Sequence, residues 1–98
     1  MARQVRWTEN AAEDLEQLIQ YLKKEWSAES AYKFVRKLFI KIEIISHLPH
    51  AGARSEKMPE IRRILITSHT SLYYSFDEKT IIILNIFDNR RNPHESIF

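Results

Sequence analysis

The sequence predicts an α+β fold of order β-α-α-β-β-β, in which a helical hairpin packs on one face of a twisted, mainly antiparallel sheet. Three observations predict it. Apolar and polar residues alternate near the N-terminus, apolar residues then recur with helical spacing up to residue 48, and three short runs rich in Ile, Leu and Tyr follow. All 98 residues, 1–98, are expected to form one domain.

The first two elements are a short strand and a helix. Residues 3–7 place Val5 and Trp7 on one side of an extended chain. From Asn10 the spacing becomes helical, and Asn10 with Glu13 fits a capping box that starts a helix. The predicted apolar stripe of this helix comprises Leu15, Leu18, Ile19, Leu22 and Trp26.

A second helix follows directly, with Ser27 as its expected N-cap. It must end before Pro49, because proline disfavours helical geometry at the preceding residue. A turn near residues 26–28 makes the two helices antiparallel, and residues 49–59 are predicted to be a surface loop. The apolar stripe of the second helix comprises Ala31, Phe34, Val35, Leu38, Ile42 and Ile45.

The C-terminal half is predicted to form three strands, at residues 61–67, 71–76 and 80–87. The short connections 68–70 and 77–79 favour hairpins. The third run is almost continuously apolar, which indicates a central strand covered on both faces over part of its length. One face of the middle strand is expected to carry Leu72, Tyr74 and Phe76.

Composition narrows the classes of function. Without Cys, the chain has no disulfide, thiolate metal site or cysteine nucleophile. No apolar run approaches the about 20 residues that span a bilayer, and the N-terminus does not resemble a signal peptide, so a cytoplasmic protein is expected. A net charge of +2 does not by itself argue for a nucleic-acid partner. His47 and His50 straddle Pro49, and neither a metal nor a cofactor is expected.

The second predicted helix carries a row of cations. Lys33, Lys37 and Lys41 are four residues apart, and Arg36 lies close to them. A solvated helix face is the favoured interpretation. Tracking of a phosphate backbone is the alternative, although no aromatic residues interleave with the row, as single-strand binding usually requires.

The strongest candidates for a binding surface lie in the C-terminal half. Arg62 and Arg63 are consecutive on a strand, so they point to opposite faces and only one of them can face a cleft on the open side. Arginine suits phosphate or carboxylate ligands, and His69 could exchange protons near neutral pH. The alternative is a loop histidine, core tyrosines and arginines that cover a sheet edge. The candidates are Arg62, Arg63, His69, Tyr73, Tyr74, Arg90 and Arg91.

The chain resembles toxins of the RelE/ParE superfamily from bacterial type II toxin–antitoxin operons. The resemblance spans nearly the whole chain, and the order and spacing of its pieces carry it. These pieces are Trp7-Thr8; Asp14-Leu15-Glu16-Gln17-Leu18-Ile19-Gln20-Tyr21 with Trp26; Leu48-Pro49, Gly52 and Ile61-Arg62; and Leu72-Tyr73-Tyr74, residues 81–88 and Arg90-Arg91-Asn92-Pro93.

The resemblance implies one of two mechanisms. RelE-like members are ribosome-dependent endoribonucleases, which would make Arg62, His69 and Arg90 the catalytic candidates. Their usual pattern is poorly matched, because the lysine positions hold Arg62 and Ile64 and the next strand opens with Ser71, so that only Arg90 fits. ParE-like members poison DNA gyrase, and the uninterrupted hairpin favours that branch. A non-toxic homologue that still binds antitoxin is the third alternative.

The same resemblance implies a cognate antitoxin whose flexible C-terminal part folds onto the toxin. A groove between the helical hairpin and the sheet, rimmed by arginines, would receive its apolar and acidic segment. DNA gyrase, or the ribosome with mRNA, would be the further partner, and no membrane is expected. The isolated chain should expose an apolar patch and self-associate. The partner- or anion-binding residues would be Arg62, Arg63, Tyr73, Arg90 and Arg91.

Overall fold

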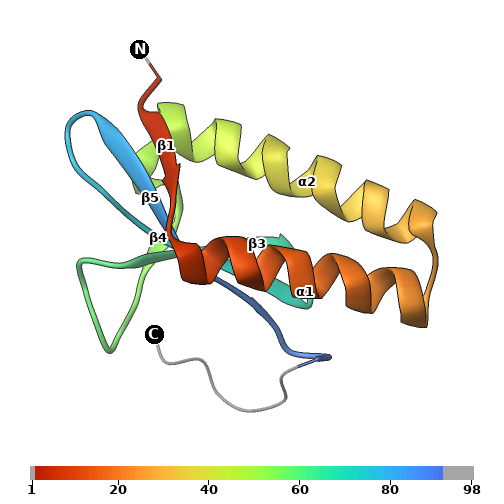
Figure 1. The fold of residues 1–98 in the computed structure, drawn as a ribbon. Coiled ribbons are helices and arrows are strands. Elements are labelled where there is room, and N and C mark those ends of the chain that lie inside the picture. Colours follow the sequence, from red (N-terminus) through yellow and green to blue (C-terminus); the bar gives the residue numbers. More distant parts are fainter. Residues whose placement is uncertain (1, 92–98) are drawn as a thin grey trace.

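A computed structural model describes residues 2–91, so Met1 and residues 92–98, including Asn92 and Pro93 of the resemblance, lie outside the described part. Two helices lie together on one face of a five-stranded sheet (Figure 1), which confirms the predicted α+β class. The elements are β1 (Gln4–Trp7), α1 (Glu9–Glu25), α2 (Ala28–His47), the short 3-10 helix η1 (Pro49–Ala51), β2 (Ala53–Arg54), β3 (Arg62–Thr67), β4 (Thr70–Phe76) and β5 (Thr80–Asp88).

The strand order is β1-β5-β4-β3-β2. β5 pairs with β4 in antiparallel fashion and with β1 in parallel fashion, so the N-terminal strand lies beside the last strand at one edge of the sheet. β2 is a strand that sequence reasoning missed. Its two residues, Ala53 and Arg54, pair with β3 from inside the predicted loop, and two residues are too few to show an alternating pattern.

The start of α1 differs from the prediction. Thr8, not Asn10, is the N-cap, because its extended backbone lets Thr8 Oγ1 accept the Ala11 N–H at 3.1 Å. Asn10 lies in the first turn, where its side chain donates to the Leu84 carbonyl at 3.3 Å. Ser27 is confirmed as the N-cap of α2, since its Oγ accepts the Ser30 N–H at 3.0 Å.

The core lies between the hairpin and the sheet, and it contains most of the predicted stripes. Leu18 and Leu22 of α1 are buried, as are all the predicted residues of α2 except the half-buried Val35. Trp26 was wrongly predicted to face the core, because α1 ends at Glu25 and the Trp26 side chain is 63% exposed. The sheet contributes the fully buried Leu72, Tyr74, Ile81 and Ile83.

A β-bulge shapes the centre of β5. Tyr73 pairs with Asn85 but Tyr74 pairs with Ile83, so Leu84 is the extra residue. This keeps Ile83 and Ile86 on the helix side although they are three residues apart. Asp14 of α1 holds the bulge, because Asp14 Oδ2 accepts the Ile86 N–H at 3.0 Å and the Asn85 side-chain amide at 2.7 Å.

The helices cover only one face of the sheet in the described part of the chain. Ile82 and Leu84 of β5 are half-buried rather than enclosed on the other face, which corrects the expectation that part of β5 is covered on both sides. Neither described helix is long and apolar enough to cross a membrane. Arg63, His69, Tyr73 and Arg90 lie on the sheet face opposite the helices or at the edge of the hairpin, whereas Tyr74 lies in the core.

Candidate functional site

Arg63, Tyr73 and His69 meet on the sheet face opposite the helices, where Tyr73 is buried. Arg63 pairs directly with Tyr73 across β3 and β4, so the two side chains share a face. With His69 from the β3–β4 turn they line a cavity of about 230 Å³, which we call the open-face cavity. Its other lining residues are Leu65, Ser68, Ser71, Phe87 and Asn89. Arg63 is its one permanently charged lining residue among those described.

Arg62 points to the opposite face, as strand geometry predicted. Its Nη1 donates to the Gly52 carbonyl at 2.7 Å and to the His50 carbonyl at 3.3 Å. The guanidinium carbon also lies 6.0 Å from the centroid of the Phe76 ring. Arg62 therefore fastens the loop after α2 to the sheet, and it is not among the residues that line the open-face cavity.

Arg90 is held by a buried carboxylate. Asp88 is 2% exposed, and its two oxygens accept from Arg90 Nε at 3.2 Å and Arg90 Nη2 at 2.8 Å. Thr70 Oγ1 donates to Asp88 Oδ2 at 2.7 Å. Burial raises the pKa of the Asp88 carboxyl, but the hydrogen bonds from Arg90 and Thr70 outweigh it and hold that pKa below its ordinary value. The hydrogen bonds to Asp88 raise the pKa of Arg90, so both groups stay charged.

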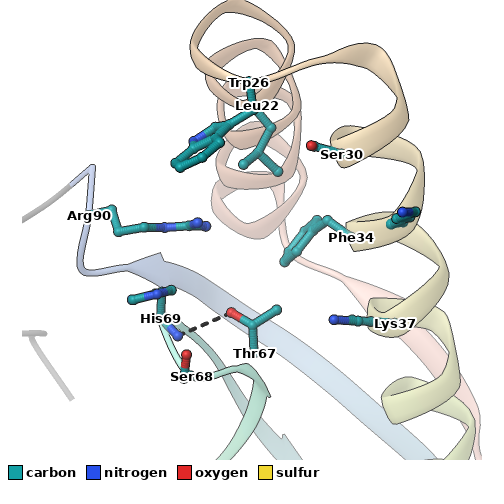
Figure 2. Close-up of a pocket in the computed structure, with 10 residues that line it drawn as sticks. Leu22, Trp26, Ser30, Phe34, Lys37, Thr67, Ser68, His69 and Arg90 are labelled. Carbon is teal, nitrogen blue, oxygen red and sulfur yellow. Dashed lines mark hydrogen bonds between the residues drawn. The ribbon is translucent and has the colours of Figure 1, made fainter.

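The guanidinium of Arg90 enters a second cavity, of about 360 Å³, between the helical hairpin and the β3–β4 turn. We call it the hairpin pocket. Figure 2 shows Trp26 at the end of α1 and Arg90 after β5 reaching into the same space, with Phe34 of α2 beside them. The remaining lining residues are Leu22, Ser30, Lys33, Lys37, Thr67, Ser68 and His69. His69 therefore lies between the two cavities and lines both.

The hairpin pocket combines apolar and cationic walls. Lys33 has a partner in Glu29 at 3.3 Å and Arg90 has one in Asp88, but Lys37 has no ion pair with any described residue. None of the ten lining residues carries a carboxylate. An anionic group joined to an apolar one would find complementary walls here. Lys33 and Lys37 are exposed, as the predicted solvated face requires, and nothing in the sequence indicated that they also border a pocket with the exposed Trp26.

Arg91 lies apart from the other candidates. Its Nη2 donates to Gln17 Oε1 at 2.8 Å, on the outer side of α1. The structure thus brings together Arg63, Tyr73 and His69 in one cavity, and His69 and Arg90 in the other. Of the three nuclease candidates, His69 and Arg90 line the hairpin pocket together, and Arg62 is not among the lining residues of either named cavity. Within residues 2–91, no group of three or more His, Cys, Asp or Glu side chains is arranged to hold a metal.

The helical hairpin over a five-stranded sheet of this order is a fold that the chain shares with solved structures of toxin–antitoxin systems. The family model described as the ParE toxin of the type II toxin–antitoxin system parDE matches residues 5–93. The chain therefore belongs to the ParE toxin family, whose members are type II toxin–antitoxin toxins. No curated protein matches the chain significantly.

Solved structures share the fold. The chromosomal ParDE system from Pseudomonas aeruginosa is 24% identical, covering 89% of this chain and 96% of that one with a TM-score of 0.75. The RelBE2 toxin–antitoxin complex from Mycobacterium tuberculosis is 20% identical over 90% and 99% of the two chains, with a TM-score of 0.64. The Escherichia coli DinJ–YafQ toxin–antitoxin complex is 11% identical over 94% and 98%, with a TM-score of 0.66.

Proposed function

We propose that the chain inhibits growth by acting on DNA gyrase and that a cognate antitoxin neutralises it. The match of residues 5–93 to the ParE toxin family carries this proposal. The placement of the nuclease candidates supports it further. Arg62 is engaged by two backbone carbonyls and is not among the residues that line the hairpin pocket with His69 and Arg90, so the three candidates do not form one catalytic group.

Purified gyrase tests the proposed target directly. The chain, added without antitoxin, should increase gyrase-mediated cleavage of supercoiled plasmid, and its induced expression should arrest growth with DNA-damage signalling. The matched negative control is the same chain premixed with its antitoxin. Growth arrest without any effect on gyrase cleavage would reject gyrase as the target.

The antitoxin is proposed to use the hairpin pocket. An acidic side chain would meet Lys37 and Arg90, and an apolar side chain would pack on Trp26 and Phe34. The complexes of RelBE2 and of DinJ with YafQ show that toxins of similar fold are bound by antitoxins. The cationic walls of the hairpin pocket would attract the flexible acidic segment of the antitoxin and so speed its association.

A charge reversal at Lys37 tests whether the antitoxin binds the hairpin pocket specifically or is only attracted to the basic surface in general. Lys37→Glu should weaken antitoxin binding at least about tenfold, because a like charge then faces the acidic segment. Lys41→Glu is the matched control, since Lys41 lies one turn further along α2 and lines neither named cavity. Equal weakening by both variants, measured by titration calorimetry, would exclude the hairpin pocket as the specific site.

The open-face cavity favours a second candidate, a ribosome-dependent endoribonuclease. Arg63 could offset phosphate charge there, and His69 and Tyr73 could position or exchange protons. This function predicts codon-phased cuts in mRNA in arrested cells, relieved by Arg63→Ala or Arg90→Ala. Intact transcripts would reject it. Tight antitoxin binding without growth arrest would instead identify a non-toxic homologue.

A further inference from the structure

Helix α2 carries a second apolar surface on the side opposite the core. Phe39, Ile40 and Ile44 are 51%, 56% and 38% exposed. At 100° per residue, Ile40 lies about 160° around the helix from the fully buried Leu38, so the two stripes face in nearly opposite directions. With Arg36 and Glu43 these three residues border a shallow hollow of about 490 Å³. We call this set of five residues the outer stripe.

The charges of the outer stripe are arranged symmetrically about its centre. Arg36 precedes Phe39 by three residues, and Glu43 follows Ile40 by three residues. A two-fold axis between Phe39 and Ile40 would therefore place each Arg36 opposite Glu43 of a second copy and each Phe39 opposite Ile40. Because one patch serves both subunits of a two-fold dimer, it must be self-complementary, and the outer stripe meets this condition.

We propose that the chain forms a homodimer in which the two α2 helices pack antiparallel through their outer stripes. The charge pattern selects a second copy as the occupant. The outer stripe holds one cation and one anion, so a partner of a single charge sign would repel one of them. Lys33 and Lys37 line the hairpin pocket, where an acidic partner would bind instead.

The individual contacts are consistent with this pairing. Glu43 Oε1 lies 3.0 Å from His47 Nε2, which leaves Oε2 available to the Arg36 guanidinium of the second copy. Arg36 has no hydrogen bond or ion pair with the described residues of its own chain. Phe39 leans on Trp7 with ring centroids 6.4 Å apart, which holds the centre of the stripe in place. The proposal does not depend on the cellular target.

Charge reversal provides a sharp test. In sedimentation equilibrium, the chain freed of antitoxin should dimerise with a dissociation constant between about 1 and about 500 µM, the range expected of a small interface. Arg36→Glu and Glu43→Arg should each raise the dissociation constant about tenfold, because two attractive pairs become repulsive. The double variant restores opposite charges and should return to within about threefold of the unmodified chain.

Ile40→Glu should abolish the dimer, and Met58→Glu is its matched control. Met58 is also an exposed apolar residue, at 41%, but lies in the loop between β2 and β3. Circular dichroism confirms that each variant is folded. The proposal is overturned if the unmodified chain is monomeric, if the dimer survives Ile40→Glu, or if the double charge variant is no tighter than the single ones. A monomer whose outer stripe is protected from hydrogen exchange only by antitoxin would likewise overturn it.

Discussion

Replacing Tyr74 by Phe should loosen the loop that follows α2. The Tyr74 hydroxyl is fully buried, donates to the Pro49 carbonyl at 2.7 Å and accepts the Gly52 N–H at 2.9 Å. It therefore joins β4 to both ends of η1. Phenylalanine keeps the ring and its packing but leaves a buried N–H and a buried carbonyl without their partner.

The expected loss follows from those two groups. Each unsatisfied buried group costs about 1–3 kcal/mol. The loop can relax towards water in part, because Ala51 and Ala53 are exposed, so we expect a total loss of about 2–3 kcal/mol in the free energy of unfolding. For a chain of this size that corresponds to a melting temperature lower by about 10–20 °C.

Urea unfolding and amide hydrogen exchange would measure the effect. Tyr32→Phe is the matched control, because the Tyr32 side chain is 63% exposed and its change should stay within about 0.5 kcal/mol. The amide of Gly52 should exchange faster in Tyr74→Phe and not in the control. A loss below about 0.5 kcal/mol, or unchanged protection of Gly52, would refute the reasoning.

Because the Tyr74 hydroxyl is buried, we also expect the free energy of unfolding to fall at alkaline pH. Burial raises the pKa of the Tyr74 hydroxyl above its ordinary value, although the Gly52 N–H and the Arg62 charge oppose this. The unfolded chain therefore loses this proton first, and stability should fall as the pH rises above about 10 towards the raised pKa. Tyr74→Phe should lack this component in a pH series of urea unfolding.

Three further substitutions test the contacts that shape the fold. Gly52→Ala should lose about 1–3 kcal/mol, because a Cβ would lie 2.6 Å from the Tyr74 hydroxyl oxygen, and a double-mutant cycle with Tyr74→Phe should show a loss smaller than the sum. Asp88→Asn should lose about 2 kcal/mol at pH 7 by urea unfolding. Because the pKa of Asp88 is lowered on folding, its contribution disappears as the pH falls below about 3.8, so the variant should show a flatter acid profile. Asp14→Ala should lose about 1–2 kcal/mol and speed exchange of the Ile86 amide, and an unchanged exchange rate would contradict the tie between α1 and the bulge.

The local parts of the fold were predictable from short stretches of sequence. Helical spacing identified both helices, and Ser27 was correctly chosen as a cap because capping depends on a residue and its next three neighbours. The same local logic failed at Asn10, since Thr8 and Asn10 are both suitable caps. In the structure the Asn10 side chain donates to Asp14 and to the Leu84 carbonyl on a distant strand instead. The prediction that Trp26 belongs to the apolar stripe was also wrong, because α1 ends one residue earlier, at Glu25.

The candidate site was predictable only in part. Strand geometry required Arg62 and Arg63 to face opposite sides, and they do. Which one faces the open side depends on the pairing of β3 with β4 and on the loop carbonyls that Arg62 binds. The hairpin pocket was less accessible to sequence reasoning, because its walls come from segments more than 60 residues apart, from Leu22 to Arg90.

Residue order alone determined the α+β class, the helical hairpin and the three longer strands of the C-terminal half, because periodicity and capping act over a few residues. Tertiary structure alone decided that β1 joins β5 in parallel, that β2 exists, and that Asp88 directs Arg90 into the hairpin pocket. These features depend on backbone pairing and buried charges between distant segments. Such contacts leave no periodic trace in the sequence, and they form only when the hairpin packs on the sheet.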